Sequence, residues 1–552
     1  MLITPERVMP IMFDETMFDK NKNQPDLADG PSKMNERWDD LRDGLLDLSQ
    51  PVYLARDEGN VIKIVNPGDS ATLSNNQQIV FAPALFIDKL GDPTFLSAHG
   101  CEAAFYAGAM ANGISSPEMV IAMGKNGLLC SYGSGGVAPN TVSAAIEQIQ
   151  SALPEGPYMV NLLNSPFEPG LEDQIVDLFI QHQVHTMEAS AYLAITPGLV
   201  RFRAQGLSLR PDGKIEINNH IIAKISRKEI ARRFMQPAPE KLLAELVQEG
   251  HISQQQANLA SQVPMADDIT VEADSGGHTD NRPLLCLLPT MIAEREAVYQ
   301  AFPQLRGHIR IGAAGGISTP ESALAALMAG AAYVVTGSIN QACIEAATSL
   351  KTRTLLAQAD MADVIMAPSA DMFEMGARVQ VLKRGTMFAM RAAKLYEIYR
   401  AYNSIEEIPA KDRQQIEQKF FQRSFDEVWE DTVAFFEQRS PTQITRADRD
   451  PKHKMALIFR WYLGLSSRWS INSENGREMD YQVWCGPSMG AFNDWVRGTY
   501  LEAVDQRRVV DVNLHILIGA AYLYRLRILE AQGIQLPEVL KTYRPASPIV
   551  SD

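Results

Sequence analysis

Paired cysteines are missing from this sequence. The chain has 552 residues and only five cysteines, which lie far apart and form no CxxC pair. They are Cys101, Cys130, Cys286, Cys343 and Cys485. An odd, scattered set argues against a disulfide framework and against a zinc site, so no metal is expected. The same pattern predicts a reducing compartment such as the cytoplasm.

Basic residues are also fewer than acidic ones. The chain carries 51 Lys and Arg against 66 Asp and Glu, which gives a net charge of −15 and a pI near 5.2. Nucleic-acid binding needs a concentrated positive surface, so no nucleic-acid partner is expected. The opening MLITPERVMPIMFDE has no basic segment followed by an apolar run, and no secretory signal is expected.

No long run is free of polar residues. The most apolar late stretch, residues 509–526, is interrupted by Asp511, Asn513, His515 and Arg525. This pattern predicts a buried helix rather than a membrane span, so no membrane partner is expected.

The length and a hydrophobic content of 46% predict two or three domains with a large core. Residues 1–95 contain the short β-like runs VYLAR, VIKIV and QIVFAPALFI between turn signals, which predict a β-rich N-terminal module. Residues 351–552 show no strand signal and predict a helical C-terminal domain. Its expected helices are 376–402, 405–421, 425–438, 454–467, 489–505 and 510–533.

Between residues 96 and 350, eight strand-like runs alternate with helical segments. The alternation indicates an α/β fold with a parallel sheet, and eight units over about 250 residues match a (β/α)8 TIM barrel. A doubly wound open sheet is the alternative, but the first strand lacks a GxGxxG turn. Two insertions interrupt the rhythm: a hairpin at 207–218 and a helix-rich segment at 226–263.

Glycine turns follow the seventh and eighth strands of this series. Gly315 and Gly316 come after the strand IRIGAA and before a helix that should start at Thr319-Pro320, and Gly337-Ser338 ends the next strand. Backbone N–H groups at a helix N-terminus suit a phosphate, and barrels use these two turns for that purpose. The alternative is that the glycines only make tight turns.

Other strand ends carry polar or small residues that a flavin could use. They are Gly108, Ala109, Met110, Asn161, Lys224, Glu272, Gly276, Gly277 and His278. A buried lysine is costly unless it is paired or liganded, and an asparagine offers both a donor and an acceptor. FMN fits one phosphate site better than a dinucleotide does. His278 can exchange protons near neutral pH and is the catalytic candidate, although it could be an ordinary loop residue.

The order of these motifs is similar to the FMN-dependent barrels of nitronate monooxygenases and FabK-type enoyl-acyl-carrier-protein reductases. The resemblance covers residues 96–350 and rests on AAFYAGAM, YMVNLL, HIIAKIS, VEADSGGHTD, IRIGAAGGIST and AYVVTGS. The chain departs from the family at two turns. It has Gly108-Ala109-Met110 where the family has a double glycine before the methionine, and Gly337-Ser338 where the family has Gly-Thr in the final turn.

Nearly the whole chain resembles the PfaD family of trans-acting enoyl reductases of polyunsaturated fatty acid and polyketide synthases, including the late DPKHKMALIFRWYLGLSSRW and DYQVWCGPSMGAFNDW. The resemblance implies reduction of a 2-enoyl thioester on an acyl carrier protein, with NADPH or NADH as the reductant of FMN. His278 would act as acid or oxyanion donor, or only position the substrate. A homodimer is expected. The rival functions are a nitronate monooxygenase-type flavin oxidase and a non-catalytic synthase scaffold.

Two basic clusters could dock an acidic carrier protein on this acidic chain. The first is Arg227, Lys228, Arg232 and Arg233, and the second is Arg446, Arg449, Lys452 and Lys454. The alternative is that both are solvated helix faces.

Overall fold

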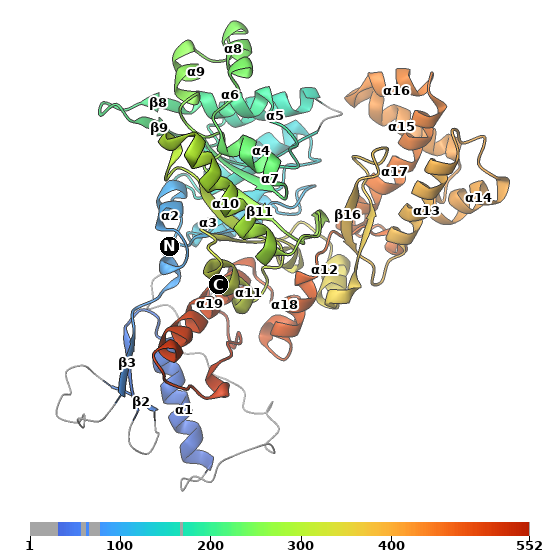
Figure 1. Ribbon diagram of the computed structural model, residues 1–552. Helices are drawn as coiled ribbons and strands as arrows, with labels where there is room; N and C mark the ends of the chain where they lie inside the picture. The colour runs from blue at the N-terminus through green and yellow to red at the C-terminus, as the bar shows by residue number, and fades with distance from the viewer. Residues whose placement is uncertain (1–30, 57–61, 66–77, 166–168, 551–552) are drawn as a thin grey trace.

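The computed structural model describes residues 31–56, 62–65, 78–165 and 169–550 (Figure 1). Of the predicted N-terminal module, residues 1–30 lie outside the described part. Residues 57–61 and 66–77 lie outside it as well, and the described residues of the module include a helix, α1 (Pro31–Leu46), and an antiparallel sheet in the order β2-β1-β3. The strands are β1 (Val52–Arg56), β2 (Ile62–Ile64) and β3 (Gln78–Ala82).

Eight parallel strands form a closed barrel in the centre of the chain. Their order around the barrel is β4-β5-β6-β7-β10-β11-β13-β14, and β14 pairs with β4 to close it. The strands are β4 (Phe105–Ala107), β5 (Leu129–Tyr132), β6 (Met159–Leu163), β7 (Thr186–Ser190), β10 (His220–Ile225), β11 (Asp268–Glu272), β13 (Arg310–Ala314) and β14 (Val334–Thr336). All eight strands lie between residues 96 and 350 and alternate with helices as predicted, so the TIM barrel is confirmed over the open sheet.

Helices surround the barrel and several begin at a proline that follows an oxygen-bearing N-cap, such as Ser116, Thr196 and Thr319. They are α3 (Pro117–Lys125), α4 (Pro139–Ala152), α5 (Pro169–Gln181), α6 (Pro197–Gln205), α7 (Lys228–Met235), α10 (Leu284–Ala301) and α11 (Pro320–Met328). Within 207–218, β8 (Leu207–Leu209) and β9 (Ile215–Ile217) form a hairpin. Within 226–263, α8 (Glu240–Gln248) and α9 (Gln254–Ala260) follow α7.

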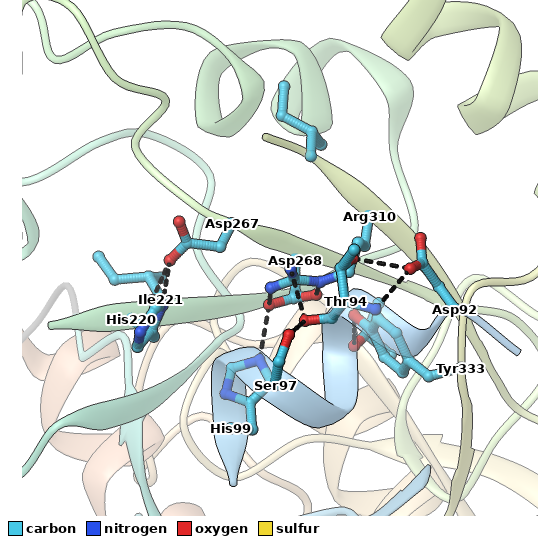
Figure 2. Close-up of polar contacts among 12 residues, drawn as sticks. Asp92, Thr94, Ser97, His99, His220, Ile221, Asp267, Asp268, Arg310 and Tyr333 are labelled. Carbon is cyan, nitrogen blue, oxygen red and sulfur yellow. Dashed lines mark hydrogen bonds and ion pairs between the residues drawn. The ribbon is translucent and has the colours of Figure 1, made fainter. Parts of the chain in front are cut away.

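Helix α2 (Pro93–His99) closes the barrel at the end where the strands begin, and Figure 2 shows the buried polar cluster that joins it to the strands. Arg310 donates two hydrogen bonds to Asp268, at 2.6 and 2.8 Å, and His99 Nε2 lies 2.9 Å from the same carboxylate. Burial raises the pKa of Asp268, but the charge of Arg310 and the hydrogen bonds from Arg310 and His99 outweigh it and hold the pKa below its usual range.

Asp268→Asn should destabilise the protein by about 3–5 kcal/mol, because it leaves the buried Arg310 guanidinium without its counter-charge. Chemical denaturation monitored by circular dichroism measures the effect. Asp212→Asn is the matched control, because Asp212 forms an exposed pair with Arg210 at 3.8 Å and should cost at most about 1 kcal/mol. Because the folded pKa of Asp268 is lowered, its contribution is present above the unfolded pKa of about 4 and is lost as the pH falls below it. Equal stability of the two variants would contradict this prediction.

The last long helix, α19 (Val509–Ala531), packs against α11, α3, β3 and α1. It is long and apolar enough to cross a membrane by length and composition, but 94% of its most apolar window is buried inside the protein. The buried Arg525 donates hydrogen bonds to the carbonyl oxygens of Leu45, Asp47, Gln50 and Pro83. The helix therefore joins the N-terminal module to the barrel, and the prediction of a buried helix is confirmed.

The prediction that no strand follows residue 350 is wrong. Strands β15 (Val364–Pro368) and β16 (Arg378–Leu382) form an antiparallel hairpin, and the two-residue strand β12 (Gly277–His278) pairs with β16. The helix expected at 376–402 begins only at Phe388. The run RVQVL starts with alternating polar and apolar residues, but β16 is the central strand of its sheet, and its partner β12 lies about 100 residues earlier in the sequence.

The rest of the C-terminal region is helical, as predicted. Helices α13 to α17 gather beside the barrel and are called here the helical lobe (Figure 1). They are α13 (Phe388–Ala401), α14 (Ala410–Gln415), α15 (Phe425–Arg439), α16 (Pro441–Ala447) and α17 (Pro451–Asn472). Two further helices, α12 (Leu350–Ala357) and α18 (Ser488–Val496), pack against each other, and α12 also contacts α17. The domain boundaries at residues 95 and 350 stay predictions.

Candidate active site

A cavity of about 1180 Å³ opens at the carboxyl ends of the barrel strands and extends to the helical lobe. Every residue proposed from the sequence for the cofactor or for catalysis lines it. These are Gly108, Ala109, Met110, Asn161, Lys224, Glu272, Gly276, Gly277, His278, Gly315, Gly316, Gly337 and Ser338. The structure therefore brings them together, while their individual roles stay predictions.

The glycine turns after β13 and β14 fit a bound anion. The backbone N–H groups of Gly316 and Gly337 find no acceptor in the described residues. A Cβ atom built on either glycine meets no described atom within 4 Å, and Gly316 has φ +78°, a backbone conformation that favours glycine. Helix α11 begins close by, with Thr319 as its N-cap. Free N–H groups beside a helix N-terminus and an open cradle are what a phosphate requires.

The loop before His278 is braced by a segment that follows the helical lobe. A Cβ atom on Gly276 would lie 3.0 Å from the backbone nitrogen of Cys485, so the two chain segments approach too closely for a side chain. Ser338 Oγ accepts a hydrogen bond from the N–H of Gly486 at 3.1 Å. The hydroxyl of Ser338 is therefore engaged by this segment, and its backbone is the part that remains for a ligand.

Lys224 lies between two carboxylates in the barrel mouth. Its Nζ is 3.3 Å from Glu272 Oε1 and 3.8 Å from Glu188 Oε1, and the Lys224 side chain is 14% exposed. Burial lowers the pKa of Lys224, but the two carboxylates outweigh it and raise the pKa, so the ammonium stays charged. The sequence predicted a cation here, and the structure shows that this cation lies between two carboxylates.

Glu188 is a residue that the sequence reasoning missed. Its side chain is completely buried, and it accepts hydrogen bonds from the N–H of Ala109 at 3.0 Å and from the Tyr106 hydroxyl at 3.3 Å. It therefore fixes both the turn after β4 and the position of Lys224. The available signal was an acidic residue in the middle of a predicted barrel strand.

Asn161 has less freedom than its sequence position suggests. Its side-chain nitrogen donates to the Glu188 carbonyl oxygen at 3.0 Å and to Ser190 Oγ at 2.9 Å. The protein thus uses the donor side of the amide. The side-chain oxygen is the atom that a ligand can still engage.

His278 is held by the β15–β16 hairpin. Its Nε2 lies 3.2 Å from Ser369 Oγ and 3.3 Å from Asp371 Oδ1, and the side chain is 36% exposed. Burial lowers the pKa of His278, but the hydrogen bond and charge of Asp371 outweigh it and raise the pKa above its usual value. Ser369 and Asp371 were missed because their hairpin was not expected. The available signal was the polar turn PSADM before β16.

The two basic clusters are partly occupied by contacts inside the protein. Arg227 pairs with Asp280 at 3.2 Å, and Arg232 pairs with Glu294. Lys452 donates to the carbonyl oxygens of Tyr399 and Tyr402, and Lys454 lies over the Trp429 ring. A docking role for either cluster stays a prediction.

A family model described as nitronate monooxygenase matches residues 102–407, which is more than half of the chain. The chain belongs to the nitronate monooxygenase family. A second family model, described as the inserted helical domain of [acyl-carrier-protein] S-malonyltransferase, matches residues 402–481 within and just beyond the helical lobe. This member of the nitronate monooxygenase family therefore has a helical addition that follows the barrel.

Several relatives extend the likeness to most of the chain. One of the polyunsaturated fatty acid synthase proteins of Thraustochytrium sp. is 47% identical over 91% of this chain, which spans 34% of that protein. Polyketide biosynthesis protein PksE of Bacillus subtilis is 42% identical over 84% of this chain, which spans 60% of that protein. The chain therefore spans about a third of the length of the first relative and three fifths of the length of the second.

A solved structure gives the fold likeness. The enoyl reductase domain of MlnA from the macrolactin biosynthesis cluster of Bacillus amyloliquefaciens is 38% identical, with a TM-score of 0.77. The match covers 81% of this chain and all of that domain. Together with the synthase relatives, it confirms the resemblance found in the sequence.

Proposed function

We propose that the chain is an FMN-dependent enoyl reductase. It acts in trans on 2-enoyl thioesters carried by acyl carrier protein domains of a polyunsaturated fatty acid or polyketide synthase. The observation that carries this proposal is the likeness to the enoyl reductase domain of MlnA, all of which the chain covers. The cavity supports it, because the candidate flavin turns and His278 face one space.

The residues of the barrel mouth fit FMN. The free N–H groups of Gly316 and Gly337 would hold its phosphate, and Met110, Asn161 and Lys224 would line its ring. When bound, FMN supplies a carrier that takes a hydride from NADPH or NADH and gives it to the β-carbon of the enoyl thioester. Glu188 keeps the turn at Ala109 in place for the ring.

His278 would supply the proton for the α-carbon. Asp371 and Ser369 engage Nε2, and among the described residues no partner engages Nδ1. The raised pKa keeps the ring protonated at a higher pH than an ordinary histidine, so an N–H at Nδ1 can donate as charge builds on the thioester.

Asp371→Asn should move the pH dependence of enoyl reduction to lower pH. The wild-type pKa of His278 is raised by Asp371, so its acid form persists as the pH rises, and the variant loses that form earlier. We expect a severalfold loss of kcat/KM at neutral pH and little loss below the ordinary histidine pKa of about 6.5. A pH profile of kcat/KM measures this. Asp280→Asn, which removes the partner of Arg227, should keep the wild-type profile.

Turnover of purified protein tests the proposed function. With NADPH or NADH and a crotonyl thioester of pantetheine, the product should be the saturated thioester, with one reductant consumed per double bond. The family model gives one rival, a nitronate monooxygenase. Consumption of a nitronate with oxygen, and none of the enoyl thioester, would favour that rival. A protein that cannot be loaded with FMN would indicate a synthase scaffold instead.

The expected setting follows from the same proposal. The partners are carrier protein domains of a multi-subunit synthase, the protein works in the cytoplasm, and it forms a homodimer. Each of these would be tested separately, by co-purification, fractionation and light scattering.

A further inference from the structure

One face of helix α17 lines the cavity along several turns. Trp461, Gly464 and Arg468 follow each other at spacings of three and four residues, so they lie on one side of the helix, and all three line the cavity. The neighbouring Ser467 accepts a hydrogen bond from Asn112 at 3.1 Å, and Asn112 belongs to the loop after β4. This contact fixes the stripe beside the barrel mouth. Trp461, Gly464 and Arg468 are called here the α17 stripe.

Gly464 is an unusual residue for this place. It lies inside a helix of 22 residues, where glycine is less favourable than almost any other residue. A Cβ atom on Gly464 would meet no atom of the described chain within 4 Å, so no close packing requires the glycine. The residue leaves the helix surface bare at a point where it borders the cavity.

Charge along the cavity is uneven. Its carboxylates Glu272, Asp280, Asp371 and Asp431 each have a cationic partner, namely Lys224, Arg227, His278 and Arg423. The exposed side chains of Arg468 and Arg378, in contrast, have no hydrogen-bond or ion-pair partner in the part of the chain that the structure describes. In a chain with a net charge of −15, two uncompensated arginines at one cavity favour an anionic ligand.

Arg378 approaches the cavity from the side of the candidate acid. It is the first residue of β16, and the next residue, Val379, pairs with His278. The cavity therefore offers a cation on the helical lobe, a cation on the hairpin and a bare, partly apolar helix face next to Trp461. A long, thin ligand with a phosphate at one end fits this combination.

We propose that the α17 stripe binds the phosphate-bearing arm of the thioester substrate. Arg468 holds the phosphate, with Arg378 as the second cation of the rim, and the neutral arm passes over Gly464 beside Trp461. The inference rests on the proposed function and deepens it, because it assigns the site that recognises the carrier arm. Arginine suits this role because its planar fork binds phosphate oxygens in pairs.

Paired substrates test this site. The same enoyl group is presented on pantetheine and on 4′-phosphopantetheine, and KM and kcat are measured for the wild type and for Arg468→Ala. The wild type should prefer the phosphorylated thioester by about tenfold in KM, as expected for one charge-assisted contact. Arg468→Ala should lose that preference, because its KM for the phosphorylated thioester should rise to the value for the pantetheine thioester. Arg400→Ala, an exposed arginine of α13 away from the cavity, should behave as the wild type.

A second variant separates binding from folding. Gly464→Leu replaces glycine by a better helix former at an open position, so the melting temperature should stay the same or rise. Its side chain would cover the bare helix face, so KM should rise for both thioesters.

The outcomes are distinct. Equal KM for the two thioesters in the wild type, or an unchanged preference in Arg468→Ala, would overturn the inference while the proposed function stands. An Arg468→Ala effect confined to the KM of NADPH would assign the phosphate site to the reductant and would also overturn it. Reduction of neither thioester by the flavin-loaded wild type would remove the proposed function itself.

Discussion

Gly316→Val should be purified without bound flavin. Valine would fill the open cradle at the turn after β13 and move the N–H groups that we assign to the phosphate. It would also have to adopt φ near +78°, which costs about 1–3 kcal/mol for a residue with a side chain. The expected result is the loss of the visible flavin spectrum and of all enoyl reduction. The spectrum of the purified protein before and after incubation with FMN measures it.

Gly307→Val separates loss of the cradle from backbone strain. Gly307 has φ +86°, and a Cβ atom there also meets no described atom within 4 Å, but it lies in the turn before β13 and does not line the cavity. Both variants carry the same kind of strain, and only Gly316→Val should lose the flavin. Full flavin content in Gly316→Val would place the phosphate elsewhere.

His278→Gln should lower the rate of enoyl reduction by about 100- to 10,000-fold, the usual contribution of a general acid. Glutamine keeps a hydrogen-bond donor of similar size but cannot hold a transferable proton. Reduction of the bound flavin by NADPH should be unchanged, because that half-reaction needs no proton at the α-carbon. Stopped-flow measurement of the two half-reactions resolves these effects.

Two results would revise the role of His278. Equal losses in both half-reactions would indicate that the histidine only positions ligands. Wild-type rates in both would exclude it from the chemistry. His251→Gln is the matched control, because His251 is an exposed histidine that does not line the cavity.

The barrel was predictable from the sequence because its signals are local. The strand runs are short, and several of the following helices begin with a capping residue and a proline, as at Ser116 and Thr319. The β15–β16 hairpin was not predictable in the same way. The third strand of the sheet that contains this hairpin is the two-residue β12, and a strand so short has no recognisable sequence pattern.

The candidate site was also predictable only where its signals are local. Gly315 and Gly316 after β13 could be recognised by their residue type, because both have a positive φ that few other residues adopt. Asp371 and Ser369 reach His278 only because the hairpin folds back from the C-terminal region. Glu188 was visible as an acidic residue in a predicted strand, but its partners Tyr106, Ala109 and Lys224 come from other parts of the barrel. Contacts between distant segments depend on how the elements pack, and a single sequence contains no direct signal for that packing.

The visible spectrum of the purified protein under anaerobic conditions tests the central claim most directly. We predict a bound flavin that is bleached by NADPH or NADH and recovers its colour when a 2-enoyl thioester is added, with the saturated thioester as product. Recovery with a nitronate and oxygen, but not with the enoyl thioester, would contradict the account.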